Sequence, residues 1–333
     1  LRFVFLTGIT KFSQLSIFSE LNNISNISMK DDYAGICGIT ETELLDDMQD
    51  GIAGLAKANE LTPRQVVAKL KENYDGYHFS AHSPGVFNPF SLLSSLANKD
   101  FDSYWFASGT PTYLVNMLQR FNVQPASLQR MCAKSSAFDS PTETMKTIAP
   151  LLYQSGYITI KGYDKISQLY TLDLPNKEVK VGLFESLLPN YLDGSYAEQG
   201  DVAIARMSVL IRQNDIDGAL RLLQTFLATV PYCNVTNHEG HYQQMLFIIF
   251  TLLTHYVVDV EVHTPKGRVD IVMLTADRLY LIELKLNKDA DAAMKQIDLK
   301  NYADRFALSG KLITKVGINF DSSVGNITDW RIA

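Results

Sequence analysis

The sequence predicts a mixed α/β protein, and three observations support this fold class. The 333 residues are 46% hydrophobic and 20% charged, a composition typical of folded globular chains and not of disordered ones. Short β-type runs alternate with helical patterns along the chain, beginning with the apolar run 1–6. Two pairs of strand-like runs, within 157–174 and 268–285, surround short turns and are typical of β-hairpins.

Residues 1–143 mix short strands with helices and are predicted to form a first domain. Helical patterns follow one another at 13–21, 41–48, 62–73, 91–97 and 111–121. Pro63 stands at the first position of one of these helices, where a backbone N–H is not needed. The chain begins at Leu1, inside a strand-like run, so we expect it to be the C-terminal part of a longer gene product.

Residues 144–185 show a helical pattern followed by a hairpin with strands at 157–163 and 168–174. This order is that of a small winged-helix unit, and a hairpin lying on a helix without a DNA-binding role is the simpler interpretation. Residues 186–230 are predicted to form amphipathic linking helices. Residues 231–333 are predicted to form a further domain, with a very apolar helix, three or four strands and an amphipathic helix between strands.

Charge and apolar patterning narrow the classes of function. The longest apolar run, 245–253, is far shorter than the roughly 20 residues of a transmembrane helix, so we expect no membrane span and a cytoplasmic location. The cysteines Cys37, Cys132 and Cys233 are widely spaced and indicate no disulfide framework. The formal net charge of −6 excludes a chain coated in basic residues. Residues 231–333 nevertheless carry 11 Lys or Arg against 12 Asp or Glu, so local contact with DNA is possible there.

A carboxylate pair stands on the second predicted hairpin. Two β-rich runs flank the turn 275–278, and pairing the strand ends at this turn puts Asp270 opposite Glu283. The same pairing puts Arg268 opposite Lys285. Residues directly opposite on antiparallel strands share one face, with Cβ atoms about 5 Å apart. Because side chains alternate along a strand, Glu283 and Lys285 also share that face.

Two carboxylates at this distance repel each other by about 3 kcal/mol at an effective dielectric constant of about 20. A divalent cation between them would remove this cost, and Mg²⁺ or Mn²⁺ is expected because these ions suit carboxylate and carbonyl ligands. The backbone carbonyl of Leu284 offers a further oxygen, and Lys285 could orient a water molecule or counter charge on a phosphate. The alternative is that both carboxylates form surface salt bridges with the basic residues of the same hairpin.

Two flanking helices add candidate site residues. The amphipathic helix expected after Lys288 has Gln296 and Tyr302 at the two borders of its apolar stripe. Upstream, Glu239 precedes the very apolar helix. Thr236 and Glu239 also fit an N-terminal capping box, so capping and metal binding both remain open for Glu239.

This pattern resembles the PD-(D/E)XK nuclease superfamily. Gly267-Arg-Val-Asp270, twelve intervening residues and Glu283-Leu-Lys285 match the superfamily motif, and the helix with Gln296 and Tyr302 is similar to the one that follows it. The resemblance implies a restriction-endonuclease-like α/β/α core within 231–333. It also implies a catalytic set of Asp270, Glu283, Lys285 and Gln296. The implied metal ligands are Asp270, Glu283, Glu239 and the Leu284 carbonyl. The implied nucleic-acid contacts are Arg268, Lys288 and Tyr302.

The whole chain also resembles a bacterial family in which a predicted AAA-ATPase-like domain precedes this nuclease domain. The similar stretches are Phe5-Leu-Thr-Gly8, Phe18-Ser-Glu-Leu-Asn22, Tyr74-Asp-Gly-Tyr77, Asn88-Pro-Phe-Ser91 and Leu152-Tyr-Gln-Ser-Gly-Tyr157. The resemblance implies that 1–143 is the C-terminal portion of a P-loop ATPase domain, through which homo-oligomers could form. The chain contains no G-x-x-x-x-G-K-[ST] motif, so we expect ATP to bind only in a longer natural chain.

The function expected from these observations is metal-dependent hydrolysis of DNA phosphodiester bonds. In the natural full-length protein, the resemblance implies coupling to the AAA-ATPase-like domain. The alternative is a regulatory module, related to defence or to mobile elements, that binds nucleic acid or protein through a nuclease fold without cutting.

Overall fold

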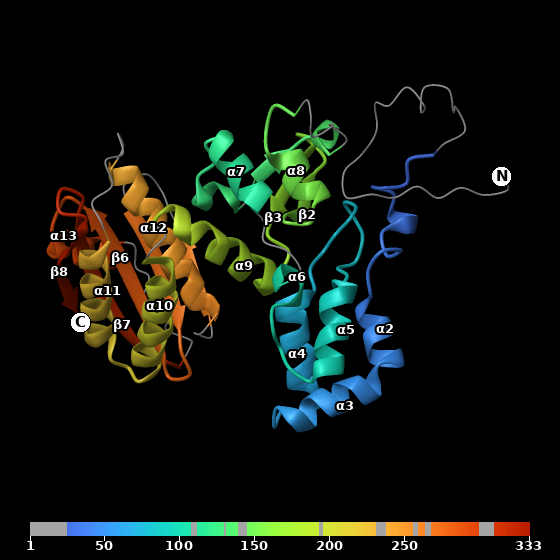
Figure 1. Ribbon diagram of the computed structural model, residues 1–333, viewed down its shortest axis with the longest axis horizontal. Coiled ribbons are helices and arrows are strands. Elements are labelled where there is room, and N and C mark those ends of the chain that lie inside the picture. Colours follow the sequence, from blue (N-terminus) through green and yellow to red (C-terminus); the bar gives the residue numbers. More distant parts are fainter. Residues whose placement is uncertain are drawn as a thin grey trace. The chain divides into compact units, whose positions relative to one another are not determined.

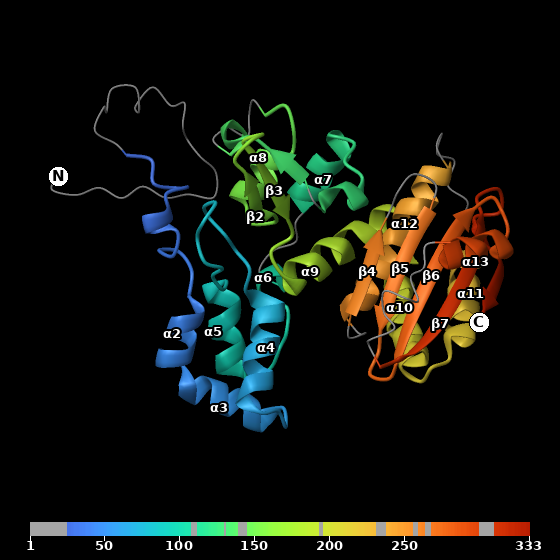
Figure 2. The ribbon, with the colours of Figure 1, turned by 180° about the vertical axis from the view of Figure 1, so that it is seen from behind.

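The computed structural model describes residues 25–107, 112–129, 131–138, 145–192, 196–230, 238–255, 259–263, 268–299 and 310–333. The chain divides into two compact units, Leu1–Leu183 and Phe184–Ala333. Each unit combines helices with one antiparallel or mixed sheet, which confirms the mixed α/β class (Figures 1 and 2). The strand expected at 1–6 and the helix expected at 13–21 lie outside the described residues.

The first unit begins with helices whose ends follow the local sequence signals. Thr40 and Thr62 each cap a helix, because their side-chain oxygens accept hydrogen bonds from the backbone N–H groups of Glu43 and Gln65, three residues later. The side chains of Glu43 and Gln65 accept hydrogen bonds from the backbone N–H groups of the two threonines in return, which completes a capping box at each helix. The α-helices are α2 (Glu41–Asp47), α3 (Gln49–Ala58), α4 (Pro63–Tyr74), α5 (Pro89–Asn98), α6 (Tyr104–Ala107), α7 (Thr112–Arg120), α8 (Ala149–Gln154) and α9 (Lys177–Leu187), and the last of them continues past the end of this unit at Leu183. Short 3₁₀ helices lie at Asp31–Tyr33, Pro125–Leu128 and Ser135–Ala137.

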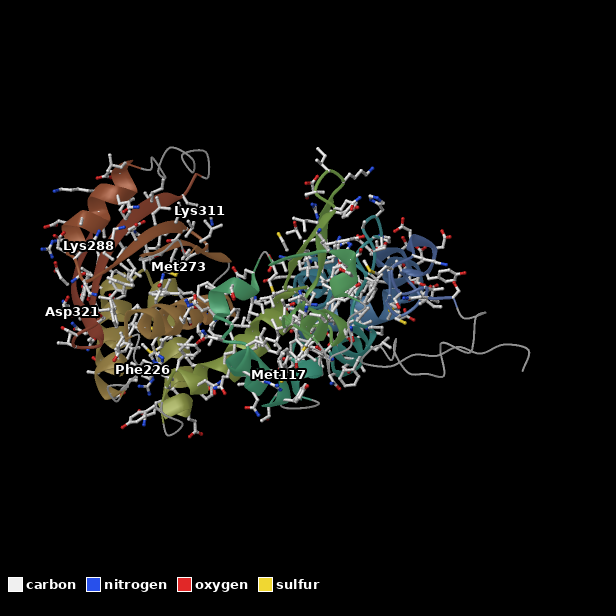
Figure 3. All side chains as sticks on the ribbon, turned by 90° about the horizontal axis from the view of Figure 1, so that it is seen from above. Met117, Phe226, Met273, Lys288, Lys311 and Asp321 are labelled. Carbon is white, nitrogen blue, oxygen red and sulfur yellow. The ribbon has the colours of Figure 1, made fainter. Side chains whose placement is uncertain are left out.

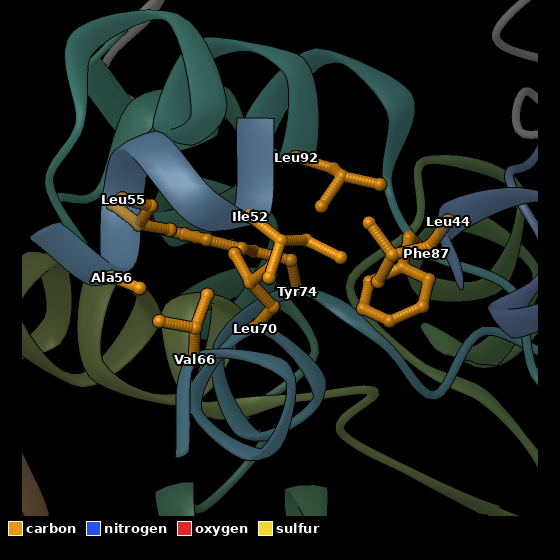
Figure 4. Packing of buried hydrophobic residues seen from close by; sticks show 9 residues of the cluster. All are labelled: Leu44, Ile52, Leu55, Ala56, Val66, Leu70, Tyr74, Phe87 and Leu92. Atoms are coloured by element: carbon orange, nitrogen blue, oxygen red, sulfur yellow. The ribbon is translucent and has the colours of Figure 1, made fainter. Parts of the chain in front are cut away.

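The core of this helical part lies between α3, α4 and α5. On α3 and α4 the buried side chains come from positions spaced three or four apart. The pattern over 62–73 predicts α4, whereas α3 was not among the predicted helices. Figure 4 shows this cluster, which consists of Leu44, Ile52, Leu55, Ala56, Val66, Leu70, Tyr74, Phe87 and Leu92.

A three-stranded sheet follows, with the strand order β1-β3-β2 and antiparallel pairing throughout. Its strands are β1 (Met131–Ala133), β2 (Thr159–Asp164) and β3 (Leu169–Asp173). The hairpin expected from 157–174 is confirmed, since β2 and β3 pair with Tyr163 opposite Tyr170. The ring of buried Phe138 contacts both Tyr153 of α8 and Tyr170 of β3, so helix and hairpin share an aromatic core.

Glu178, in the first turn of α9, is a buried carboxylate that holds another helix. It is 5% exposed, and its Oε1 accepts hydrogen bonds of 2.7 Å from the backbone N–H groups of Tyr104 and Trp105 at the start of α6. These donors are among the groups that a helix N-terminus leaves without partners. Burial raises the pKa of the Glu178 carboxyl above its ordinary value, although the two backbone hydrogen bonds act against this rise.

Replacing Glu178 by alanine is expected to lower the free energy of unfolding by about 2–3 kcal/mol, because two buried N–H groups lose their acceptor. Glu178→Gln keeps an acceptor oxygen and should cost less. A carboxyl whose pKa is raised in the folded state takes up a proton more readily there than in the unfolded chain. Lowering the pH from neutral towards the ordinary value of 4.5 should therefore stabilise the wild type relative to Glu178→Gln.

Urea unfolding followed by tryptophan fluorescence tests this prediction in a Trp330→Phe background. The chain has two tryptophans, so the signal then comes from Trp105 alone. Equal pH dependence of the wild type and Glu178→Gln would contradict the assignment.

The second unit contains a five-stranded sheet with the order β4-β5-β6-β7-β8. Its strands are β4 (Asp259–His263), β5 (Arg268–Leu274), β6 (Arg278–Leu286), β7 (Leu312–Asp321) and β8 (Asn326–Ile332). Only β6 and β7 pair in parallel, while the other neighbours are antiparallel. The helices are α10 (Ala197–Arg212), α11 (Ile216–Thr229), α12 (His238–Leu252) and α13 (Ala290–Leu299), with short 3₁₀ turns at Leu188–Asn190 and Leu253–His255.

Helices cover both faces of this sheet and give three layers (Figures 1 and 2). On one face, α12 packs against β4 and β5, and α11 packs against β8. Gln224 of α11 donates a hydrogen bond of 2.7 Å to the carbonyl of Ile327, and Asn326 donates one of 3.1 Å to the carbonyl of Gln224. The segment 186–230, expected to link domains, therefore contributes α11 to the layer that covers the sheet.

The other face of the sheet carries α13, which packs against β6, β7 and β8. Leu279 and Leu281 of β6 form a buried cluster with Ile297 of α13. Because side chains alternate along β6, the residues at 283 and 285 face the same layer. Within the ranges described, the structure contains no helix long and apolar enough to cross a membrane.

Candidate active site

The register of β5 and β6 agrees with the pairing predicted from the sequence. Asp270 pairs with Glu283 and Arg268 pairs with Lys285. The four-residue turn between the strands fixes this register, because a shift by one residue would turn the apolar side chains to the wrong face. The two acidic positions of the predicted motif are thus direct neighbours across the hairpin.

Glu283 and Lys285 form a buried ion pair under α13. Glu283 is 0% exposed and Lys285 is 5% exposed, and the Lys285 Nζ atom lies 2.5 Å from Oε1 of Glu283. The same ammonium group donates a hydrogen bond to Oε1 of Gln296 on α13. A buried charge is tolerated when it is paired and hydrogen-bonded, and both partners are present here. This pair is therefore not a surface salt bridge, the alternative that the sequence left open.

Gly317 of β7 pairs with Glu283 in the parallel ladder and lets α13 approach the sheet closely. A Cβ atom at this position would lie 2.6 Å from the Ala290 carbonyl oxygen and 2.8 Å from Cγ of Met294. Such distances leave no room for a side chain, so the helix occupies the space beside Glu283 on the β7 side. The same close packing brings Gln296 within reach of Lys285.

The connection from β6 to α13 is fixed by two asparagines. Oδ1 of Asn319, on β7, accepts a hydrogen bond of 2.9 Å from the backbone N–H of Lys288, while its Nδ2 donates one of 2.9 Å to Thr328. Asn287 adopts a positive φ of 55° and accepts a hydrogen bond of 2.8 Å from the backbone of Ser322. The side chain of Lys288 remains exposed at the outside of this unit (Figure 3).

Asn319 was not among the predicted site residues. It is 7% exposed and pairs with Lys285 in the parallel ladder, so it lies in the row next to that of Glu283. The available sequence signal was a polar residue inside the apolar stretch 316–320. Its partner Lys288 lies 31 residues away, so local patterns could not identify the contact.

For several other predicted site residues, the structure describes the backbone and not the side chain. The side chains of Asp270, Arg268 and Glu239 are not among the described ones, although Glu239 falls in the first turn of α12. Tyr302 lies outside the described residues. The side chain of Leu284 is fully buried in the other layer, so its backbone carbonyl is the group that a metal could use.

The chemistry of these residues fits a small divalent cation. The buried carboxylate of Glu283, the paired position of Asp270 and a strand carbonyl provide oxygen donors, which Mg²⁺ and Mn²⁺ accept. Among the described side chains, which do not include Asp270 and Glu239, no group of three or more His, Cys, Asp or Glu residues comes together. The fit therefore rests on the donor types and on the register.

The comparisons with known proteins point to the same part of the chain. Residues 237–330 match the model of the PD-(D/E)XK nuclease superfamily, a stretch that contains α12, α13 and the strands β4 to β7. This match supports a nuclease-superfamily domain at the C-terminal end, with Asp270, Glu283 and Lys285 inside it.

Nearly the whole sequence is similar to a curated protein, the "Uncharacterized protein in vnfD 5′ region" of Azotobacter chroococcum mcd 1. The two are 31% identical over 328 residues, which cover 96% of this chain and 61% of the relative. The chain thus spans 61% of the length of that protein. No solved structure matches the chain.

Proposed function

We propose that the second unit hydrolyses DNA phosphodiester bonds with the help of Mg²⁺ or Mn²⁺. The observation that carries this proposal is the buried pair of Glu283 and Lys285, directly beside the register position of Asp270. A central strand of a globular domain gains little from burying two charges, because desolvation offsets most of their attraction. Retaining them suits a site that binds a cation and a phosphate.

Each residue of the site has a proposed role. Asp270, Glu283 and the Leu284 carbonyl would hold the metal ion, with Glu239 as a further ligand. The ion, when bound, supplies a Lewis acid for the phosphate oxygens and lowers the pKa of a water molecule. The ammonium of Lys285 would orient that water or counter the charge that develops on the phosphate. Arg268, Lys288 and Tyr302 would contact the DNA backbone.

Gln296 would act as a positioning residue for Lys285. Its amide oxygen accepts a hydrogen bond from the ammonium group, so the flexible lysine side chain is held from the helix side while Glu283 holds it from the strand side. A catalytic group held in this way loses less conformational freedom when the substrate binds.

The direct test is cleavage of supercoiled plasmid and end-labelled oligonucleotides with Mg²⁺, Mn²⁺ or excess chelator. We expect cleavage only with metal, and a loss of at least about tenfold in Glu283→Gln because a charged ligand is replaced. The matched control is Asp298→Asn, which removes an exposed carboxylate from α13 in the same unit. Cleavage that is equal in wild type, Glu283→Gln and Asp298→Asn would overturn the proposal.

The same assay separates the proposal from a binding module that does not cut. DNA binding without cleavage, together with Mn²⁺ binding that does not depend on Glu283, would favour the regulatory alternative.

Under both functions we infer that the protein acts in the cytoplasm.

The first unit is proposed to be the C-terminal portion of an AAA-ATPase-like domain within 1–143, followed by a winged-helix-like unit at 144–185. The antiparallel order β1-β3-β2, with α8 before the hairpin, supports the second part of this proposal. Coupling to ATP and the formation of homo-oligomers are proposed for a chain as long as the Azotobacter relative, of which this chain covers 61%. The absence of detectable ATP binding to the present chain, against binding by a longer one, tests this division.

A further inference from the structure

The strand β8 is an edge of the five-stranded sheet, because β7 is its only partner among the described strands (Figure 1). Lys315 of β7 and Ala333, directly after β8, exchange two backbone hydrogen bonds of 2.7 and 2.9 Å. Such pairs recur at every second residue of an antiparallel ladder, so the backbone groups of Trp330 and Ile332 face away from β7. This edge therefore presents backbone donors and acceptors to which a further strand could bind.

The two helices next to β8 lie on its faces and leave its edge accessible. Nε1 of Trp330 donates a hydrogen bond of 2.9 Å to Asp217 of α11 on one face, while the Arg331 guanidinium lies 3.4 Å from Asp291 of α13 on the other. The side chain of Ile332 is 41% exposed. The outward carbonyl of Trp330 accepts a hydrogen bond of 3.1 Å from Arg331, a half-exposed side chain of the same strand.

The charged residues of β8 are symmetric about Trp330, with Asp329 before it and Arg331 after it. Both charges lie on one face, because the Arg331 guanidinium is 2.6 Å from the Asp329 carboxylate. If two copies pair antiparallel about Trp330, Asp329 of each copy lies opposite Arg331 of the other. Opposite charges across antiparallel strands attract, whereas like charges repel. Charges on an edge strand usually exclude a second strand, but this arrangement favours a second copy in one register.

We propose that two copies of this chain associate through β8, pairing antiparallel about a two-fold axis at Trp330. The two Trp330 backbones exchange hydrogen bonds, and each Arg331 side chain moves from its own strand to Asp329 of the second copy. A two-fold contact uses the same surface on both chains, so it closes at a dimer. The inference is independent of the proposed function, because these three residues are outside the candidate active site. It also differs from assembly through the first unit.

Sedimentation velocity of the full chain over a range of concentrations measures the association. One strand from each chain makes a small interface, so we expect a dissociation constant of about 1–100 µM. Asp329→Arg and Arg331→Asp each place like charges opposite one another at both ends of the pairing, so each variant should dimerise at least about tenfold more weakly. The matched control is Glu198→Arg, which reverses an exposed charge on α10 of the same unit and should leave the dimer unchanged.

Restoring the charge pairs separates this contact from a general effect of charge. In the double variant Asp329→Arg/Arg331→Asp, opposite charges again face each other across the two-fold axis and the net charge is that of the wild type. We expect its dissociation constant to lie within about threefold of the wild-type value. An equimolar mixture of the two single variants should also associate, because each substituted position then faces an opposite charge.

Three results would overturn the inference. The first is a wild-type chain that stays monomeric at about 200 µM, above the range expected for a small interface. The second is a dimer that persists in both single variants, since the association would then use another surface. The third is a dimer that is lost in the single variants and is not regained in the double variant, because the charges would then not face each other.

Discussion

Replacing Lys285 by methionine is expected to lower the rate of DNA cleavage at saturating Mn²⁺ by about 100- to 10,000-fold, the range found when a positioned acid–base or charge-stabilising group is lost. Methionine keeps much of the length of the side chain and removes the ammonium group. The effect should appear mainly in kcat, because the ammonium is expected to act on charge that develops in the transition state. Gel-based cleavage under single-turnover conditions measures it.

The same substitution should also change how the metal stabilises the fold. Without Lys285, the fully buried Glu283 loses its ionic partner, which is expected to cost about 3–5 kcal/mol in the metal-free protein. A cation at the site would take over that role, so Mn²⁺ should raise the melting temperature of Lys285→Met more than that of the wild type. Thermal unfolding in chelator and in Mn²⁺ gives both values.

Lys315→Met is the matched control for this prediction. Lys315 is paired with Asp298 at 2.6 Å but is partly exposed, so its loss should cost less than about 1 kcal/mol. It should leave cleavage and the effect of Mn²⁺ unchanged. Equal stability losses for the two lysines, or normal cleavage by Lys285→Met, would contradict the assigned role.

Gly317→Ala is expected to destabilise the second unit by about 2–3 kcal/mol, although it adds one methyl group. The added Cβ would meet a backbone carbonyl at 2.6 Å, and a backbone atom cannot rotate away. Relief requires α13 to move off the sheet, which also moves Gln296 away from Lys285. We therefore expect cleavage to fall together with stability.

Urea unfolding in a Trp105→Phe background measures the effect, because Trp330 of β8 then reports on this unit alone. Gly35→Ala serves as the control in the first unit and is read through Trp105 in a Trp330→Phe background. A Cβ there meets nothing within 4 Å and should change stability by less than about 0.5 kcal/mol. A Gly317→Ala protein that is as stable as Gly35→Ala and cleaves normally would show that the close approach is not needed.

The register of the site hairpin was predictable because local rules determine it. A four-residue turn and apolar runs on both sides leave one pairing that keeps Glu283 and Lys285 on the same face as Asp270. The position of Gln296 at the border of the apolar stripe followed from the helical period. Its place beside Lys285 was expected only from the resemblance to the nuclease superfamily. The hairpin of β2 and β3 followed from the same kind of local alternation.

The features that sequence analysis missed depend on contacts between distant segments. Asn319 reaches Lys288 only because β7 pairs with β6, and Gly317 is constrained only because α13 lies against it. The helices of 186–230 were interpreted as linking helices. An apolar stripe shows that a helix packs against something, but it does not show which sheet the helix covers.

The parallel pairing of β6 with β7 has a consequence for how the site is assembled. An antiparallel hairpin such as β5–β6 needs a short loop and can form early, whereas a parallel neighbour must wait until a long connection has folded back across the sheet. That connection includes α13, which carries Gln296. Asp270 and Glu283 are therefore expected to become neighbours before α13 arrives. A chain arrested during synthesis or refolding would then hold the two acidic positions without Gln296 to position Lys285. Acquisition of cleavage activity should accordingly be among the last events of folding.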